Sequence, residues 1–384
     1  MISRERLADT FKLLVAIDSV SKKEGKFAHE LKRKLESLGA QTLFDGAGAK
    51  MGGETGNLIA RLEGNTAVPP LLLNAHMDTV QPGQGITPVF EDGNFFSDGT
   101  TILGADDKSA IAIVLEVLRV LKEDHLDHGP LEIVFTVCEE IGLMGAKNLD
   151  FSLITAEYGY TLDATDTEGI ITQAPAANRL EFKVHGRDAH AGAAPEKGIN
   201  AILLASQAIA NLKLGRIDRE TTCNIGQIEG GLATNIVPPS VTVKGEVRSH
   251  DEEKLKQVTD EMVAAFQRAV AAFPGVSADD DLPRLEYKVD NDFPRTYIPE
   301  DHPVVTLARQ AAENLGRNMA TKITGGGADA NIFFSKGIML GVLGTGMRDM
   351  HTVRENVKLD DMVKTAELLL EIIRVQTVMV ARPT

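Results

Sequence analysis

The sequence predicts an α/β main domain with a doubly wound, mainly parallel sheet, interrupted by an inserted α+β domain. Apolar strands alternate with amphipathic helices up to residue 174, and the same rhythm returns from residue 292. Between these parts, residues 175–291 contain strands in which apolar and polar residues alternate, as in a sheet with one solvated face. A chain of 384 residues suits about two domains. We therefore predict a discontinuous main domain, 1–174 and 292–384, around an insert of 175–291.

The elements of the first part follow from periodicity and from residues that end helices. Phe27, Leu31, Leu35 and Leu38 recur at helical spacing, and Gly39 is suited to end that helix. Continuous apolar runs predict buried strands at 71–76, 131–137 and 158–164, and a strongly apolar face predicts a long helix at 106–124. Strand, helix and strand in this order are typical of a parallel sheet.

The insert and the last part of the chain are divided in the same way. Alternating strands are expected at 179–186, 222–231, 240–250 and 284–290, with amphipathic helices at about 199–214 and 251–273. The main domain then resumes with a helix at 303–315, a strand at 338–344 and a final helix at 359–380. The solvated face of the insert's sheet is expected to be open or to pair with a partner.

Composition excludes several classes of protein. A net charge of −15 argues against a sequence-independent grip on nucleic acid or anionic membranes. Cys138 and Cys223 form neither a metal-type spacing nor a disulfide framework, which fits a reducing cytoplasm. The N-terminus reads as a charged amphipathic helix rather than a signal peptide, and no apolar run reaches the roughly 18 residues of a membrane span. We expect a cytoplasmic protein.

Residues able to do chemistry cluster where predicted strands end. They are His76 and Asp78 in "NAHMDTV", Asp106 and Asp107 in "GADDKS", Glu139 and Glu140 in "CEEIGLMGA", Asp163 in "YTLDA", and His351 in "GMRDMHTVRE". Ligands of doubly wound sheets bind outside the carboxyl ends of the strands. His76 and Asp78 are two residues apart, so an extended chain turns both side chains to the same side.

Each of these residues has an ordinary structural explanation when taken alone. A single histidine beside a strand is usually hydrogen-bonded, paired acids before a helix usually complement its dipole, and paired glutamates usually face solvent. Five such segments on one edge are harder to dismiss. Glu139 and Glu140 directly follow a buried strand, where two carboxylates cost several kcal/mol unless a cation compensates them.

The donor set indicates which cation. Two imidazoles and three carboxylates, without a thiolate, suit Zn²⁺, Co²⁺ or Mn²⁺. Five ligand residues can serve two metals about 3.5–4 Å apart when one carboxylate bridges them. The remaining acids can then have other roles. Asp78 can hold the His76 ring, and one of Glu139 and Glu140 can take a proton from water.

These motifs, with "DGTTILGADDKSA", resemble in type and order the M20 family of dinuclear zinc peptidases, and most closely its peptidase T (tripeptidase) branch. The resemblance covers nearly the whole chain and implies that the insert is a lid or dimerisation domain. It implies that His76 and Asp163 bind one metal, that Glu140 and His351 bind the other, and that Asp106 bridges. Glu139 would then be the general base, and Asp78 would orient His76. Asp107 has no ligand role in the family, and helix N-terminal charge explains it better.

The insert adds three residues that the resemblance connects with substrate. His190 in "GRDAHAGAAPEKG" would stabilise the oxyanion, in the family often across a dimer. Asn235 and Arg248 would bind the substrate backbone and its terminal carboxylate, for which a guanidinium is suited. A turn residue and a surface strand charge are their ordinary explanations. The glycines of "TGGGADAN" lack the Lys-Ser/Thr of a phosphate loop and are interpreted as allowing close approach of substrate.

The resulting hypothesis is a cytoplasmic exopeptidase that hydrolyses short peptides with a water bridging two divalent metals, most favourably Zn²⁺. Its expected substrate is a short peptide, and neither nucleic acid nor a membrane is expected as a partner. A second copy of the chain is expected to bind through the lid domain as a homodimer. The same core also suits an N-acyl-amino-acid amidohydrolase or a carboxypeptidase. A small-molecule-binding protein without catalysis is a weaker alternative, because the full set of ligands and acids is present.

Overall fold

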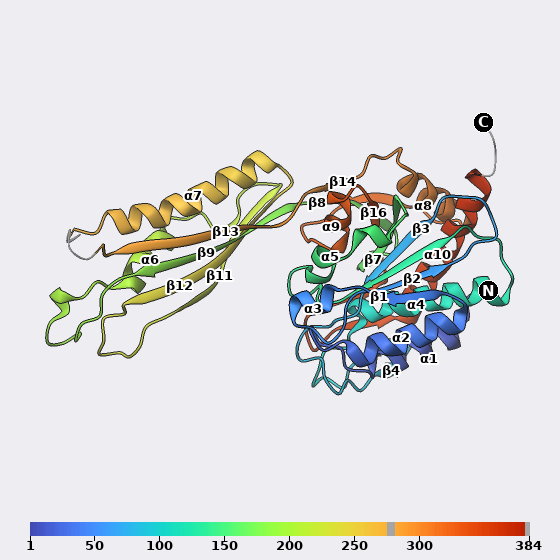
Figure 1. The fold of residues 1–384 in the computed structure, drawn as a ribbon, viewed down its shortest axis with the longest axis horizontal. Coiled ribbons are helices and arrows are strands. Elements are labelled where there is room, and N and C mark those ends of the chain that lie inside the picture. The colour runs from blue at the N-terminus through green and yellow to red at the C-terminus, as the bar shows by residue number, and fades with distance from the viewer. Residues whose placement is uncertain (275–280, 381–384) are drawn as a thin grey trace. The chain divides into compact units, whose positions relative to one another are not determined.

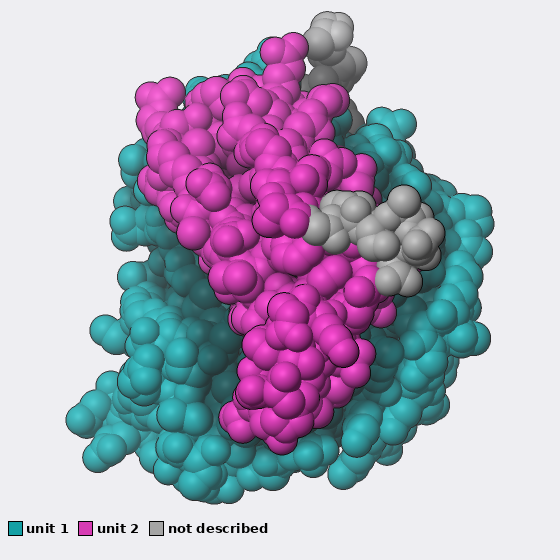
Figure 2. All heavy atoms as spheres, turned by 90° about the vertical axis from the view of Figure 1, so that its left-hand side faces the viewer, with its two compact units in different colours: residues 1–173, 297–324, 328–384 teal, residues 174–296, 325–327 magenta. Residues whose placement is uncertain are grey.

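The computed structural model describes residues 1–274 and 281–380, which form two compact units (Figure 1 and Figure 2). Unit 1 comprises Met1–Gln173, Tyr297–Thr324 and the chain from Ala328 onward. Unit 2 comprises Ala174–Thr296 and the short segment Gly325–Gly327. Residues 275–280, which belong to the predicted insert, lie outside the described residues.

A nine-stranded mixed sheet forms the centre of unit 1. Its four central strands, in the order β6-β3-β7-β16, are parallel to one another. The pairs β1–β2, β2–β6 and β16–β8 are antiparallel. The edge strand β15 pairs with β8 in parallel. The strands are β1 Gln41–Phe44, β2 Leu58–Leu62, β3 Leu71–His76, β6 Leu131–Thr136, β7 Tyr158–Ala164, β8 Gly169–Ala174, β14 Thr296–Tyr297, β15 Ala320–Ile323 and β16 Met339–Gly344. The predicted α/β class is confirmed, with a sheet that is parallel in its centre and mixed at its edges.

The parallel centre decides where polar side chains gather. All six residues of β3 and all six of β6 are buried, because these strands have neighbours on both edges and helices or chain on their faces. Parallel strands end at the same edge of a sheet. The ends of β3, β6 and β7 therefore bring His76, the residues after Thr136 and Asp163 to one place.

Long helices supply the apolar cover of the unit 1 sheet. The helices are α1 Arg4–Val15, α2 Gly25–Leu38, α3 Ala47–Met51, α4 Ala105–Glu123, α5 Met144–Asn148, α8 Pro303–Asn314, α9 Asp329–Ser335 and α10 Leu359–Val380, with a 3-10 turn at Phe151–Leu153. Helix α4 contacts α1, α2 and α10, and its residues from Ala110 to Leu118 are buried throughout. Gly39 ends α2 with φ of 101°, as its position predicted. A small four-stranded sheet completes the unit, in the order β17 Met347–Arg348, β18 Asn356–Lys358, β5 Asn94–Phe96 and β4 Val89–Glu91.

Unit 2 is an antiparallel sheet covered by two helices. Its order is β10-β11-β12-β9-β13, with β9 Ala176–His185, β10 Gly215–Arg216, β11 Thr221–Gly230, β12 Ser240–Ser249 and β13 Arg284–Phe293. Helices α6 Ala201–Ala210 and α7 Glu252–Ala271 contact each other and the sheet, and Phe182 stacks on Phe266 with ring centroids 4.0 Å apart. Burial alternates along β9, as the sequence predicted for a sheet with one face on its helices. Whether the second face is open or pairs with a partner stays a prediction.

A further 3-10 turn lies at Pro195–Lys197. Throughout residues 1–274 and 281–380, no helix is both long enough and apolar enough to cross a membrane.

The contact between β3 and β7 generates a test of the fold. A Cβ on Gly159 would lie 1.9 Å from the Leu72 carbonyl oxygen, and backbone in a central sheet has no room to move. We expect Gly159→Ala to destabilise unit 1 by about 1–3 kcal/mol or more. Gly46→Ala is the control, since nothing lies within 4 Å of its added Cβ. Urea unfolding monitored by circular dichroism measures both, and equal midpoints for the two variants would contradict the register.

Candidate metal centre

His76 and Asp163 lie at the ends of neighbouring strands. The register of β3 and β7 runs as far as the pair Asn74 and Thr161. His76 and Asp163 each lie two residues beyond that pair, and the His76 ring is close enough to act on the charge of Asp163. The His76 ring is almost fully buried and is fixed at Nδ1 by the backbone oxygen of Asp78, 2.9 Å away. Its Nε2 is therefore the nitrogen that faces the site.

Asp106 lies between the two predicted histidine ligands. Its Oδ1 is 3.0 Å from His76 Nε2, and its Oδ2 is 3.4 Å from His351 Nε2. The chain reaches this position because Gly104 adopts φ of 73° and Asp106 has non-helical angles at the start of α4. Each carboxylate oxygen of Asp106 thus faces a different histidine, which is the arrangement a bridging ligand requires.

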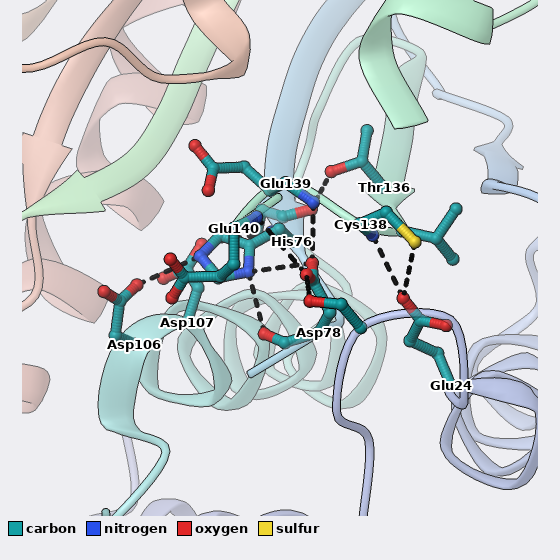
Figure 3. A network of polar contacts seen from close by, with 12 residues as sticks. Glu24, His76, Asp78, Asp106, Asp107, Thr136, Cys138, Glu139 and Glu140 are labelled. Atoms are coloured by element: carbon teal, nitrogen blue, oxygen red, sulfur yellow. Dashed lines mark hydrogen bonds and ion pairs between the residues drawn. The ribbon is translucent and has the colours of Figure 1, made fainter. Parts of the chain in front are cut away.

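The loop after β6 separates the two adjacent glutamates. Cys138 takes φ of 54°, and the two glutamate side chains then leave the chain in different directions (Figure 3). Glu140 Oε1 is 3.0 Å from His351 Nε2, so this glutamate joins the second histidine. Glu139 makes no direct contact of this kind with either histidine among the described contacts. The structure therefore distinguishes the two acids, which spacing alone left open and which the family resemblance assigned to different roles.

Asp78 has a broader set of contacts than its spacing predicted. Its carboxylate accepts hydrogen bonds from Glu139 N–H at 2.9 Å, from Glu140 N–H at 3.3 Å and from Ser21 Oγ at 2.6 Å. The His76 Nδ1 is 3.4 Å from Asp78 Oδ1, farther than from the backbone oxygen of the same residue. Asp78 therefore fixes the backbone of both glutamates as well as facing the imidazole (Figure 3).

The charges of this cluster shift its titrations strongly. Burial, reinforced by the nearby Asp106, raises the pKa of Asp163 to about 7, and burial also raises the pKa of Glu139 and of Glu140. Hydrogen bonds to Asp106 and Glu140 raise the pKa of His351 to about 10. Burial opposes a charged ring at His76, but hydrogen bonds to Asp106 and Asp78 outweigh it and hold the pKa of His76 well above its ordinary value. The cluster is therefore short of positive charge.

The donor atoms fit a divalent cation. One atom each from His76, Asp106 and Glu140 lie within 4.8 Å of one another, a spacing that suits metal binding. Imidazole nitrogen and carboxylate oxygen are ligands of Zn²⁺, Co²⁺ and Mn²⁺. His351 extends the cluster beyond Asp106 and Glu140, and Asp163 is close enough to interact electrostatically with His76, Asp106 and Glu140. The structure thus gathers the five predicted ligand residues in one cluster.

Asp107 occupies the first turn of α4, as predicted, but its environment differs from that of a solvated helix-end charge. It is fully buried, and its Oδ2 accepts a hydrogen bond from the His76 N–H at 3.2 Å. Its Oδ1 has no hydrogen-bond partner within the part of the chain that the structure describes. Asp107 therefore supports the strand end that carries His76.

The three predicted substrate residues all lie in unit 2, at two different ends of it. His190 and Asn235 are exposed and close together, because Ala191 N–H donates to the Asn235 carbonyl at 2.9 Å and His190 bridges to Ile236. Arg248 lies near the other end of β12, paired with Ala177 of β9. Unit 2 therefore brings His190 and Asn235 together and keeps Arg248 apart from them.

Arg248 already has a carboxylate partner. Its Nε and Nη2 donate to the two oxygens of Glu246 at 3.0 and 3.1 Å, and its Nη1 donates to the Gly325 carbonyl at 3.3 Å. Gly325 belongs to the glycine-rich segment, in which a Cβ on Gly327 would come within 2.5 Å of the Phe293 ring. Packing explains that glycine, and close approach of substrate to this segment stays a prediction.

Sequence reasoning passed over four residues that support the site, three of them buried and Ser21 half-buried. Glu24 accepts hydrogen bonds from the N–H and Sγ of Cys138, at 3.0 and 3.3 Å (Figure 3). Asp329 accepts a hydrogen bond from Thr136 at the end of β6. Ser21 contacts Asp78, and Glu355 accepts from the N–H of Asp106. Glu24 and Glu355 are fully buried acids, but a single acid in a loop gives no signal until its burial is known.

Comparison with known proteins identifies the family. The model of peptidase family M20/M25/M40 matches residues 72–375, which contain the whole cluster. The chain belongs to this peptidase family. It is 41% identical to the aminopeptidase PepT of Bacillus cereus, with a TM-score of 0.86, covering 98% of this chain and 99% of that one. A tripeptidase of Staphylococcus aureus is 38% identical, with a TM-score of 0.91, and the match covers 99% of this chain and all of that one.

A curated relative, YqjE of Bacillus subtilis, is 42% identical over 97% of this chain and 99% of its own length. These relatives place the chain in the peptidase T-like branch of M20, so the predicted family and enzyme class are confirmed. The protein is a hydrolase of the peptidase type.

The pKa of His351 generates a test of the cluster. The folded protein keeps a proton on this ring up to about pH 10, whereas the unfolded chain releases it near 6.5. The stability that the charged ring contributes is therefore complete below pH 6.5 and is lost as the pH rises through 10. We expect EDTA-treated protein to show a falling Tm across this interval in scanning calorimetry.

The matched variants are His351→Gln and His125→Gln. His351→Gln should flatten the dependence of Tm on pH, and His125→Gln should leave it as in the unmodified protein. A His351→Gln protein whose Tm falls as steeply as that of the unmodified protein would contradict the assigned contacts.

Proposed function

We propose that this M20 peptidase is a dinuclear metal-dependent exopeptidase that trims short peptides, as an aminopeptidase of the tripeptidase type. The observation that carries the proposal is the position of Asp106, with one oxygen toward His76 and the other toward His351. Similarity to a PepT aminopeptidase and to a tripeptidase supports the choice of substrate. In this proposal unit 1 is the catalytic domain and unit 2 the lid and dimerisation domain.

The residues group into two sites that share one ligand. His76 and Asp163, at the ends of neighbouring strands, would hold one ion, and Glu140 and His351, in contact with each other, would hold the second. Asp106 would bridge them. Zn²⁺ is the preferred occupant, with Co²⁺ or Mn²⁺ as alternatives of the same ligand chemistry. Two such ions supply Lewis acidity, which polarises a peptide carbonyl and lowers the pKa of water toward neutrality.

Glu139 is the residue that we assign to proton transfer. Its side chain diverges from that of Glu140 (Figure 3). Among the described contacts, no hydrogen bond or ion pair joins the Glu139 carboxylate to His76 or His351. Burial raises its pKa, so it binds a proton more readily than a solvated glutamate and can pass that proton to a leaving amine. Asp78 fixes the position of Glu139 by accepting its backbone N–H at 2.9 Å.

His190 is suited to donate a hydrogen bond to a developing oxyanion. Its Nδ1 accepts from the N–H groups of Gly192 and Ala193 at 3.2 and 3.1 Å. A ring nitrogen that accepts carries no proton, so the proton of the neutral ring is on Nε2. An exposed N–H held in a fixed direction is the kind of donor that stabilises a tetrahedral oxyanion. Asn235, beside it, would bind substrate backbone.

Arg248 would bind the terminal carboxylate of the peptide. The bidentate pairing with Glu246 displays the required fork geometry, and a substrate carboxylate would replace Glu246 in it. The carboxylate of Glu246 would therefore compete with the C-terminus of the peptide for Arg248.

The distance between His190 and Arg248 within unit 2 supports a homodimer. From Ser240, beside the His190 loop, to Arg248 the chain of β12 is extended over about 27 Å, whereas an extended tripeptide spans only about 10 Å. One copy of unit 2 therefore does not bring His190 and Arg248 to the same substrate. Exposed apolar side chains on unit 2, at Leu203, Ile228 and Leu232, offer surface for a second copy. We infer that the two residues serve active sites of different copies.

A cytoplasmic location completes the proposal. Cys138 and Cys223 are both buried free thiols, which is the state that a reducing compartment maintains.

Replacement of Glu139 tests the chemistry. Glu139→Gln should bind Zn²⁺ as the unmodified protein does and lose about 10²–10⁴-fold in kcat, because the amide cannot accept the proton. Glu132→Gln, a buried glutamate on β6, is the control and should keep its activity. Release of free amino acid from tripeptides measures kcat. Hydrolysis of N-acyl amino acids tests the amidohydrolase alternative, and removal of residues from the C-terminus of peptides tests the carboxypeptidase alternative. Unchanged turnover by Glu139→Gln would remove Glu139 from the mechanism.

Mixing of inactive variants tests the dimer. His190→Ala and Glu139→Gln should each be inactive alone, and refolding them together should restore about a quarter of the unmodified activity. Half of the dimers are then mixed, and each mixed dimer has one site with an intact Glu139 and a partner that supplies His190. No recovery in a mixture shown by sedimentation to contain mixed dimers would place His190 in the site of its own chain.

A further inference from the structure

Glu355 is a buried acid that lies four residues after His351. It is 1% exposed, and both of its carboxylate oxygens are used. Oε2 accepts the N–H of Leu103 at 2.8 Å and of Gly104 at 2.7 Å, and Oε1 accepts the N–H of Asp106 at 2.9 Å. Three backbone donors therefore converge on one carboxylate from a segment about 250 residues away in the chain.

These donors lie where the main chain has no partners of its own. The first N–H groups of a helix have no intrahelical acceptor. The start of α4 is also irregular, because Gly104 takes φ of 73° and Asp106 has a ψ of 101°. Regular helix hydrogen bonds therefore do not fix Asp106, and the Glu355 carboxylate takes the place of the missing acceptors.

The other side of the same contact is the loop that carries His351. Glu355 N–H donates to the Thr352 carbonyl at 3.1 Å, and Thr352 Oγ1 donates to the Asp349 carbonyl at 2.8 Å. Directly after Glu355, β18 pairs with β5, beginning at Asn356 and Phe96. The loop is compact and anchored, so a position fixed at Glu355 is transmitted to His351.

We propose that Glu355 is a positioning residue that sets Asp106 against His351 before metal binds. The proposal rests on the proposed two-metal function. Glu355 touches neither metal nor substrate in it; it holds the backbone of the bridging ligand and the loop of a second ligand through one carboxylate. Partners that orient metal ligands in this way commonly change affinity by about 10–100-fold when they are removed.

The chain offers a matched control in Glu132. This acid is 3% exposed and also accepts backbone N–H groups, from Thr155 and Ala156, both at 2.9 Å. It lies near the start of β6, at the opposite end of the strand from Glu139. Glu132→Gln and Glu355→Gln are thus similar in burial and in the shape of the substitution, and each removes a carboxylate that accepts backbone N–H groups. Only the second contacts a predicted ligand segment.

The experiment compares Zn²⁺ affinity, by competition with a fluorescent chelator, and urea unfolding of the EDTA-treated proteins. Both variants should lower the unfolding midpoint. We expect Glu355→Gln to weaken Zn²⁺ binding by about 10–100-fold and Glu132→Gln to stay within about threefold of the unmodified protein. Excess Zn²⁺ should return the kcat of Glu355→Gln toward normal with KM unchanged. Equal affinities of the two variants would overturn the role of Glu355, whereas an unmodified protein without Zn²⁺ affinity would overturn the two-metal function itself.

A measurement without substitution covers the case in which Glu355→Gln does not fold. Hydrogen exchange of the unmodified, EDTA-treated protein should show the amides of Leu103, Gly104 and Asp106 protected by about a hundredfold or more over an unstructured chain. Protection without metal means that Glu355 fixes the segment in advance. Rapid exchange of these amides, slowed only when Zn²⁺ is added, would mean that the metal orders the segment and that Glu355 does not.

Discussion

The structure depends on how several carboxylates are kept at one buried edge of a sheet. Each of them is costly to bury alone, and each is compensated by a specific contact: Asp106 by two imidazoles, Asp78 by two backbone N–H groups and a hydroxyl, and Glu355 by three N–H groups. The parallel strands concentrate these groups, because their ends coincide. The negative charge that these contacts leave uncompensated makes the cluster suited to a multiply charged cation.

The sequence predicted the features that depend on local pattern. Strands 71–76 and 158–164 have the bounds expected from their apolar runs, and Gly39 ends α2. The sequence also singled out His76, Asp106, Glu140, Asp163 and His351 by their places near strand ends and by a family order, and their role as metal ligands stays a prediction. The antiparallel edges of the sheet were not recognisable, because the direction in which a short strand runs leaves no trace in its pattern of apolar residues.

The support around the ligands was less accessible to sequence reasoning, for a physical reason. Asp78 was expected to act on the His76 ring, but its carboxylate also accepts a hydrogen bond from the backbone N–H of Glu139. That contact depends on how the loop after β6 turns at Cys138. Asp107 was expected to serve a helix end and proves to hold the backbone of β3. Such roles depend on which backbone donors are left over once the tertiary structure has formed, and spacing along the chain contains no information on that.

The insertion of unit 2 has a consequence for the order in which the protein is made. The central strand β16 and the loop of His351 follow unit 2 in the chain, so a ribosome releases β3, β6 and β7 long before their last parallel neighbour exists. During that interval the growing chain exposes an incomplete sheet edge and an incomplete His/Asp/Glu cluster. Unit 2, whose strands are contiguous in sequence, is free to fold first. The cluster of the proposed metal centre is therefore among the last features of the molecule to be assembled, and a cation that met the partial cluster earlier would be held less tightly.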